Sequence, residues 1–294
     1  MATGNVFTYD GRNVLLNRFF KSSPDYGPAS GVKFGTGTTT PTVDDTDIEE
    51  PIPINNLVQV DDCDATTGWT AGTDSAVTLN NTTYVQGTGS LNLTKSGTSG
   101  LNCSISKTTT SANMGTDSLR LFFYILNSTA LNKLATNSCV IVRFGSDSSN
   151  YYEWFFDRAD LSTGWNVLKD MTTSNGIPTG LPVTTAMDYT LVQFTTNNAS
   201  DTTSAGDIIV DNILLGSSAD AYDAFQSGIP IFDEGTQSVT IVHTLGLTTA
   251  NGYNITEFGT FNSDSTNLCL THWVITSVTK NGQVILTVSE KWQS

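Results

Sequence analysis

Short apolar and alternating runs, bounded by clusters of Gly, Asn, Asp, Ser or Pro, follow one another through the middle of the chain. One of them, SLRLFFYIL, is apolar on both faces, which predicts an interior strand covered on both sides. Repeated short strands at this spacing are typical of a β-sandwich or barrel. The clearest runs predict strands at residues 90–94, 118–126, 139–145, 151–157, 165–171, 189–196 and 207–216.

The C-terminal quarter has the same texture. SVTIVHTLG (238–246), YNITEFGTFN (253–262), LCLTHWVIT (268–276) and QVILTVSEKW (283–292) predict a four-stranded antiparallel meander. Asn281-Gly282 is typical of a two-residue type I′ turn and predicts a hairpin between the last two strands. So small a meander lacks a sufficient core, so we expect it to recruit the N-terminal segment or a partner chain.

The N-terminal region is poor in regular pattern. Residues 1–56 start with an alternating stretch and continue into loops, where Pro41, Pro51 and Pro53 exclude a helix. We therefore expect extended segments there, and a short helix or linker at 217–230. The chain is thus predicted to be all-β, with an antiparallel jelly-roll β-sandwich at 57–216 inserted into a split β anchoring module made of 1–56 and 231–294.

Composition and charge narrow the function classes. Charged residues make up only 14% of the 294 residues, while the apolar share is an ordinary 38%. The net charge of −15 argues against binding nucleic acid and against docking on anionic membranes. The sequence has no secretory signal pattern and no apolar run long enough to span a membrane, so neither is expected.

Residues suited to catalysis are sparse. The four cysteines form no CxxC pair, which argues against zinc; free buried thiols are expected, and one bridge such as Cys63–Cys103 stays open. No GxSxG, HExxH or phosphate-loop motif occurs. Glycoside hydrolysis needs two carboxylates in a cleft, and Glu153, Asp157 and Asp160 are the candidates. Such acids are common on strands and turns, so a non-enzymatic protein is predicted and a polysaccharide hydrolase is the weaker alternative.

The two ends of the chain resemble a paired pattern of tailed-bacteriophage structural proteins. Its first half is GTGTTTPT (35–42) followed by the acidic residues of 44–50, and its second half is ITEFGTFN (255–262) followed by two strands. The resemblance implies one module of a tail, neck or head appendage, built from both halves. It implies that the residues of assembly are Gly35, Gly37, Pro41, Glu257, Phe258, Gly259 and Phe261.

The middle resembles bacterial jelly-roll modules that bind carbohydrate. The matching segments are Asp61-Asp62 before Gly68-Trp69, QGTGSL (86–91), GWN (164–166) and VDNI (210–213). Such modules often hold one structural calcium where their ends meet, which implies Asp62, Gly87 and Asp211 as ligands; a carboxylate that only caps a turn is the alternative for Asp211. No other cofactor is expected.

Aromatic side chains provide the candidates for sugar binding. In YYEWFFD, Tyr152 and Trp154 share one face of the strand and Tyr151 lies on the other, so one aromatic face is core. Exposed rings stack on the CH-rich faces of sugars, and the candidates are Tyr151, Tyr152, Trp154 and Trp69. Burial of these rings in the core is the alternative.

Together these features predict a non-enzymatic virion protein, assembled in the host cytoplasm. It would contact other virion proteins and copies of itself, in the tail, neck or collar, in a baseplate appendage, or on the capsid as decoration or head fibre. The alternative is a lectin-like adhesin for a host-surface glycan.

Overall fold

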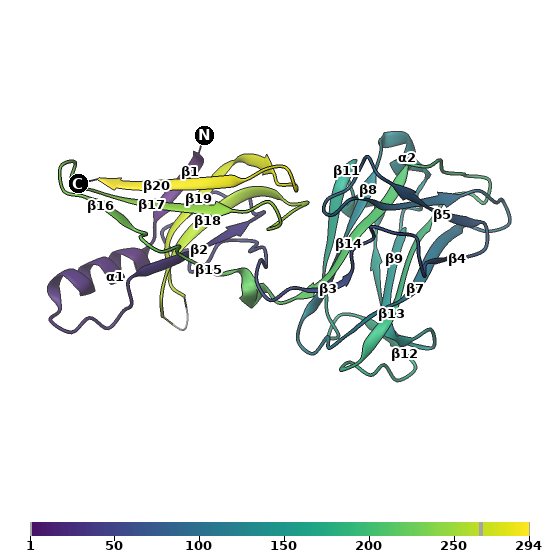
Figure 1. The fold of residues 1–294 in the computed structure, drawn as a ribbon, viewed down its shortest axis with the longest axis horizontal. Helices are drawn as coiled ribbons and strands as arrows, with labels where there is room; N and C mark the ends of the chain where they lie inside the picture. Colours follow the sequence, from purple (N-terminus) through teal and green to yellow (C-terminus); the bar gives the residue numbers. More distant parts are fainter. Residues whose placement is uncertain (1, 265–266, 294) are drawn as a thin grey trace. The chain divides into compact units, whose positions relative to one another are not determined.

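The computed structural model describes residues 2–264 and 267–293 (Figure 1). The chain divides into two compact units, one made of residues 1–56 and 218–294 and the other of 57–217. Both are antiparallel β-structures. No helix in the described part of the chain has the length and hydropathy of a membrane span.

Unit 2, residues 57–217, is a sandwich of two sheets with the strand orders β12-β10-β9-β13-β7-β4 and β11-β8-β14-β6-β5, and β3 pairs with β14. Its elements are β3 (Val58–Asp61), β4 (Thr70–Ala71), β5 (Ser75–Asn80), β6 (Ser90–Lys95), β7 (Asn102–Ala112), β8 (Ser118–Ile125), α2 (Ser128–Lys133), β9 (Val140–Asp147), β10 (Asn150–Phe156), η1 (Arg158–Asp160), β11 (Gly164–Met171), β12 (Ile177–Thr179), β13 (Met187–Thr195) and β14 (Ile208–Gly216).

One apolar core fills the space between these two sheets. Alternate residues of each strand supply it, for example Val140, Val142 and Phe144 of β9 and Val192 and Phe194 of β13. The predicted strands of the middle region are present, and β8 is buried along nearly its whole length, as its two apolar faces indicate. The all-β jelly-roll sandwich predicted for this chain is thereby confirmed.

Unit 1 also consists of two sheets, in the orders β1-β19-β18-β2-β15 and β16-β17-β20. Phe34 of β2 packs against His243 of β17, with ring centroids 5.8 Å apart, and Phe7 of β1 packs against Trp292 of β20 at 5.5 Å, so the sheets face each other. The elements are β1 (Ala2–Phe7), α1 (Tyr9–Phe20), β2 (Ala29–Gly35), η2 (Ser218–Ala221), β15 (Asp223–Ala224), β16 (Ile231–Asp233), β17 (Ser238–Leu245), β18 (Asn254–Asn262), β19 (Cys269–Thr279) and β20 (Leu286–Gln293).

The strand pairing of unit 1 corrects the predicted meander. β19 pairs with β18 and β1, whereas β20 pairs with β17 in the other sheet. The turn at Asn281-Gly282 therefore carries the chain from one sheet to the other and does not close a hairpin. The physical reason is that each strand has an apolar face, and two facing sheets bury these faces better than a single sheet does.

Two further segments differ from expectation. The stretch 9–20 was expected to be extended but forms helix α1, whose N-cap Thr8 accepts a hydrogen bond from the Gly11 amide at 2.9 Å. The 217–230 segment, expected to be a short helix or a linker, contains the short 3-10 helix η2 but also contributes a strand, because β15 pairs with β2 and extends the larger sheet of unit 1. Both segments therefore belong to unit 1.

Candidate functional site

The two halves of the paired pattern meet at one buried carboxylate. Glu257 of β18 is fully buried, and its Oε1 accepts hydrogen bonds from the amides of Gly37 at 2.9 Å and Glu50 at 2.8 Å. Its Oε2 accepts a third from the Glu49 amide at 3.0 Å. The Gly37 contact joins residues 220 positions apart in the sequence. A single side chain of the C-terminal half therefore holds the GTGTT loop and the acidic segment together.

His272 of β19 completes this cluster. Its Nε2 lies 2.8 Å from Glu257 Oε2 and its Nδ1 lies 2.6 Å from Asp45 Oδ2. Burial opposes the charged imidazole, but hydrogen bonds to Glu257 and Asp45 outweigh it and raise the pKa of His272. Burial likewise opposes the charged form of Glu257, yet His272 and the three amides lower its pKa. We call Glu257, His272, Asp45 and the three amides the Glu257 cluster.

The other predicted assembly residues of the second half also lie inside unit 1. Phe258 stacks on Trp273 with ring centroids 5.8 Å apart, and Phe261 is fully buried beside Ile48 and Cys269. Gly259 leaves no room for a side chain, because a Cβ there would lie 2.8 Å from the Thr271 carbonyl oxygen. These three residues are therefore engaged inside unit 1.

Three residues of the first half have related roles. A Cβ at Gly35 would lie 2.2 Å from Glu257 Oε1, and one at Gly37 would lie 2.6 Å from the same atom, so glycine is required at both positions. Pro41 lies next to Gly4, within 3.1 Å of where a Cβ of that residue would stand. The two glycines of the GTGTT segment thus have a local steric cause.

Trp154 and Trp69, two predicted sugar-binding residues, are only 5% and 7% exposed. The Trp154 indole donates hydrogen bonds to the Thr172 carbonyl at 3.1 Å and to Asn175 Oδ1 at 2.9 Å. Both rings pack in the core of unit 2, so neither offers a face for stacking on a sugar. The prediction is therefore wrong for Trp154 and Trp69. Tyr152 stacks on Trp154 and packs against the same core but is half-buried, so its role in sugar binding stays a prediction.

Tyr151 lies on the opposite, outer face of the same sheet. There it forms a row with Gly145 of β9 and Tyr189 of β13, which are in register across the three strands. The Tyr151 and Tyr189 rings are 6.5 Å apart, and the Arg143 guanidinium lies 4.7 Å above the Tyr151 ring. Gly145 has no side chain between the two rings. The outer face therefore presents two half-buried tyrosines and a cation.

The next row of this face is polar. Arg143 Nε donates to Glu153 Oε1 at 2.5 Å, and both side chains are partly exposed. Their row continues through Leu191 to Ser106 of β7. Arg143 and Tyr189 were not predicted from the sequence, although a single arginine within the apolar run CVIVRFG indicates that one face of that strand is exposed.

The predicted calcium ligands come together only in part. Asp211 of β14 is fully buried; its Oδ2 accepts from the Val85 amide at 2.6 Å, while its Oδ1 is buried without a hydrogen-bond partner. Burial, together with the charge of Asp64, raises the pKa of Asp211 to about 8. Gly87 lies against Asp64, whose Oδ1 accepts from the Thr88 and Gly89 amides at 2.7 Å. Asp62 is exposed, and Asp64 is the carboxylate that lies beside Gly87.

A free, buried carboxylate oxygen fits a hard cation such as calcium. Among residues 2–264 and 267–293, no group of three or more His, Cys, Asp and Glu side chains is placed to hold a metal. Any further ligands would be backbone carbonyls or water. The four cysteines offer no alternative site, because all are buried and unbridged, and burial raises the pKa of Cys103 and Cys139 to about 11.

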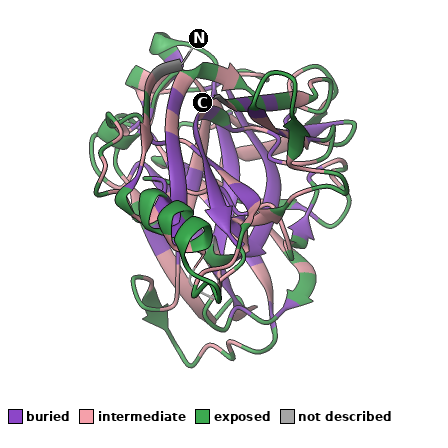
Figure 2. Cartoon of the chain, turned by 90° about the vertical axis from the view of Figure 1, so that its left-hand side faces the viewer, coloured by how far each residue is buried: buried purple, intermediate pink, exposed green. Residues whose placement is uncertain are grey.

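Helix α1 of unit 1 borders an apolar cavity of about 870 Å³. The helix buries Gly11 and Val14 but leaves Phe19 76% and Phe20 84% exposed. Its ribbon is mostly green, the colour of exposed residues, in Figure 2. Phe232 of β16 lines the cavity and is also exposed. Large exposed aromatic side chains around one cavity are typical of a contact surface for another protein.

No family model matches the chain, and no curated protein matches it significantly. Unit 2 is similar to solved carbohydrate-binding modules. A family 11 module from Clostridium thermocellum is 10% identical, with 55% of this chain and 95% of that one covered and a TM-score of 0.39. The CBM22-2 xylan-binding domain of Paenibacillus barcinonensis Xyn10C is 9% identical, with 55% and 98% covered and a TM-score of 0.33. An exo-β-agarase is 8% identical, with 55% of this chain and 25% of that one covered and a TM-score of 0.37. At these identities the comparisons concern the fold alone.

Proposed function

We propose that the chain is a non-enzymatic structural protein of a tailed-bacteriophage particle, anchored through unit 1 and presenting the jelly roll of unit 2. The observation that carries the proposal is the Glu257 cluster. Residues 35–50 and 255–262, which together resemble a pattern of phage structural proteins, meet there around one carboxylate. The position in the particle is the tail, the neck or collar, a baseplate appendage, or a capsid decoration or head fibre.

The exposed aromatic residues of α1 support anchoring. Leu16, Phe19 and Phe20 present an apolar surface that is costly to leave in water, and a neighbouring virion protein would cover it. The acidic side chains considered for hydrolysis are otherwise engaged. Glu153 pairs with Arg143, and Asp157 and Asp160 cap a short helix, which supports a non-enzymatic role.

The test is whether the chain is part of a particle. An antibody against the full chain should label phage particles purified from the culture that produces it, and the chain should co-sediment with them at constant stoichiometry. A particle reconstruction should then place unit 1 against a neighbouring protein. A chain that stays entirely in the soluble fraction, away from the particles, would overturn the proposal.

A second candidate function is binding of a host-surface glycan by the outer face of unit 2. The row of Tyr151, Gly145 and Tyr189, with Arg143 above it, supports this, because paired rings and polar side chains suit a sugar. We expect the full chain to bind members of an array of bacterial surface glycans with millimolar or tighter affinity. Tyr189→Ala should weaken binding about tenfold, equivalent to about 1.4 kcal/mol, while the exposed Tyr84→Ala serves as the matched control. Absence of binding at about 10 mM sugar, a free energy weaker than about −3 kcal/mol, would exclude this function.

We also propose that unit 2 holds one structural calcium at Asp211. The unpartnered Oδ1 of that residue supports it. Calcium would supply a charge that lets the buried carboxylate stay ionised, and the cation would have no chemical role beyond that.

A further inference from the structure

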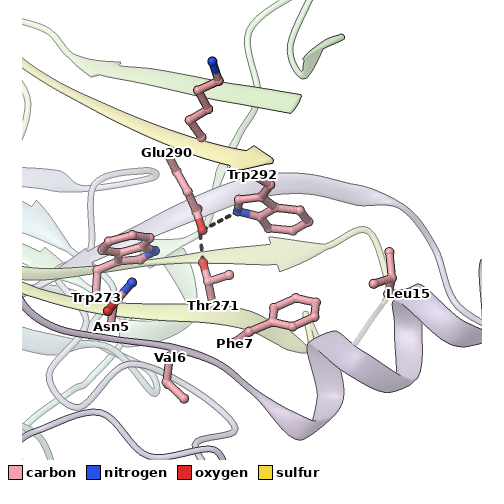
Figure 3. A pocket seen from close by; sticks show the side chains of 9 residues that line it. Asn5, Val6, Phe7, Leu15, Thr271, Trp273, Glu290 and Trp292 are labelled. Carbon is pink, nitrogen blue, oxygen red and sulfur yellow. Dashed lines mark hydrogen bonds between the residues drawn. The ribbon is translucent and has the colours of Figure 1, made fainter. Parts of the chain in front are cut away.

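Unit 1 contains a second buried glutamate, which lies at the floor of an open cavity of about 400 Å³ (Figure 3). Glu290 of β20 is 3% exposed. Its Oε1 accepts from the Trp292 indole at 2.6 Å, and its Oε2 accepts from the Thr271 hydroxyl at 3.2 Å. The cavity lies between β1 and β20, which are edge strands of the two sheets. It is therefore at the open side of the sandwich.

The charge of this carboxylate is not balanced. Glu290 takes part in no ion pair among the described residues, whereas Glu257 has a histidine and three amides. Burial raises the pKa of Glu290, while hydrogen bonds from Trp292 and Thr271 act in the opposite direction. Donors aimed at a carboxylate favour its ionised form, and an ionised buried group without a cation is costly. Lys291 also lines the cavity, yet among the described residues no ion pair joins it to Glu290.

Aromatic rings form the walls around this carboxylate. Trp273 and Trp292 flank Glu290 on either side, and Phe7 packs edge-on against Trp292 at 5.5 Å (Figure 3). The Trp273 indole N–H is buried and makes no hydrogen bond of normal geometry. Faces of Trp and Phe attract cations, and the attraction is greater where water is excluded. The aromatic rings and the carboxylate thus both favour a cation as the ligand.

The cavity is continuous in its lining with the apolar cavity beside α1. Phe7, Leu15 and Trp292 line both. A segment lying across the two would place an apolar side chain against Val14 and Phe232 and a neighbouring polar one above Glu290. The two cavities are suited to one extended stretch of protein.

We propose that this double cavity receives a segment of a different virion protein that inserts a lysine or arginine side chain against Glu290 and an apolar side chain beside α1. The proposal deepens the anchoring role and rests on it for its biological setting. A second copy of this chain is disfavoured as the occupant, because copies that each carry a net charge of −15 repel one another.

The experiment uses the full chain and small probes for the two basic side chains. The probes are N-acetyl-arginine amide and N-acetyl-lysine amide, and N-acetyl-citrulline amide is the neutral control of nearly the same shape. We expect the basic probes to shift the indole N–H resonances of Trp273 and Trp292 saturably, with millimolar Kd, and the citrulline probe to leave them unchanged. Equal shifts with all three probes would overturn the proposal.

Two variants act in opposite directions. Glu290→Gln should weaken the basic probes at least about tenfold, or about 1.4 kcal/mol, while Glu234→Gln, at an exposed site in unit 1, should leave binding unchanged. Asn5→Asp adds a charge at the exposed rim and should tighten binding about two- to fivefold, as an exposed pair does. Asn5→Asp keeps the test decisive if Glu290→Gln unfolds unit 1, and unchanged affinity in Asn5→Asp would then contradict the proposal.

Sedimentation distinguishes the occupants. Self-association of the wild-type chain that Glu290→Gln abolishes would make a second copy the occupant and overturn the assignment to a different protein. Probe binding without labelling of particles would support binding of a basic side chain in the cavity and would overturn the virion role. Labelled particles without probe binding would remove only the cavity proposal.

Discussion

Glu257 of unit 1 and Asp211 of unit 2 are both fully buried carboxylates at places where distant parts of the chain meet, yet their surroundings differ. Glu257 has three amides and His272, and its pKa is lowered. Asp211 is hydrogen-bonded through only one of its oxygens, and its pKa is raised to about 8. A buried acid can thus be accommodated by complete hydrogen bonding, or by holding a proton or a cation. Complete hydrogen bonding keeps the carboxylate of Glu257 in its charged form. The state of Asp211 depends instead on the pH of the solution and on whether a cation is present.

The largest expected effect is at the Glu257 cluster. Glu257→Ala leaves three amides and His272 without their acceptor, and we expect a loss of about 3–5 kcal/mol of stability. Scanning calorimetry of the full chain should show the transition of unit 1 lost or lowered and that of unit 2 unchanged. Glu234→Gln, at an exposed site, is the control and should shift neither transition. An equal shift of both transitions would contradict the independence of the two units.

The second effect is the pH dependence at Asp211. Its pKa rises from 3.8 to about 8 on folding, so the folded state holds a proton that the unfolded state has lost. The stabilisation is complete below pH 3.8 and falls as the pH rises toward 8, by at most about 1.4 kcal/mol per pH unit. Urea unfolding of unit 2 in a chelator should show this slope, and Asp211→Asn should flatten it. Added calcium should also flatten it in the wild type, and an unchanged slope would count against the calcium site.

The third effect concerns pH in unit 1. The raised pKa of His272 contributes stability that is complete below 6.5 and is lost as the pH rises through the folded value. The lowered pKa of Glu257 contributes stability above 4.5 that is lost as the pH falls through the folded value. The combined contribution of Glu257 and His272 to the stability of unit 1 should therefore be nearly constant between pH 4.5 and 6.5, where the contribution of Asp211 to unit 2 declines, with losses of about 1–2 kcal/mol outside this range. His272→Gln should remove the alkaline loss in urea unfolding, and a persisting loss would point to another group.

The smallest effect on stability is expected at α1. Phe20 is 84% exposed, so Phe20→Ser should change the free energy of unfolding by less than about 0.5 kcal/mol. Incorporation of the chain into particles should nevertheless fall strongly, because the side chain is available to a partner. Sedimentation with purified particles measures this, and normal incorporation would place the contact elsewhere.

The positions of the most apolar strands were predictable from the sequence in both units. The position of β7 and the pairing of strands within each sheet were not. Alternation identified β17 and β20, but parity does not say that these two pair across an intervening hairpin. Helix α1 was not predicted because its apolar residues Leu16, Phe19 and Phe20 are exposed and do not form the buried stripe of an amphipathic helix. The N-cap residue Thr8 was the only local signal for its start.

The candidate sites show the same limit. Both faces of YYEWFFD are aromatic, so the sequence left open which face was core, and only the packing of Trp154 decided it. The glutamate and glycines of the paired pattern were identified, but their common contact depends on residues 220 positions apart. No local pattern predicted the role of His272.

The first and last strands of unit 2, β3 and β14, pair directly, with Val58 opposite Leu215. In unit 1 the corresponding ends are also held together, since the Ile54 and Asn55 amides both donate to the Asp220 carbonyl at 3.1 Å. Genetic exchange of the 57–217 segment for another domain with adjacent termini would therefore leave the Glu257 cluster unbroken. Recombination could therefore replace residues 57–217 as one segment without altering the contacts that hold residues 1–56 to residues 218–294.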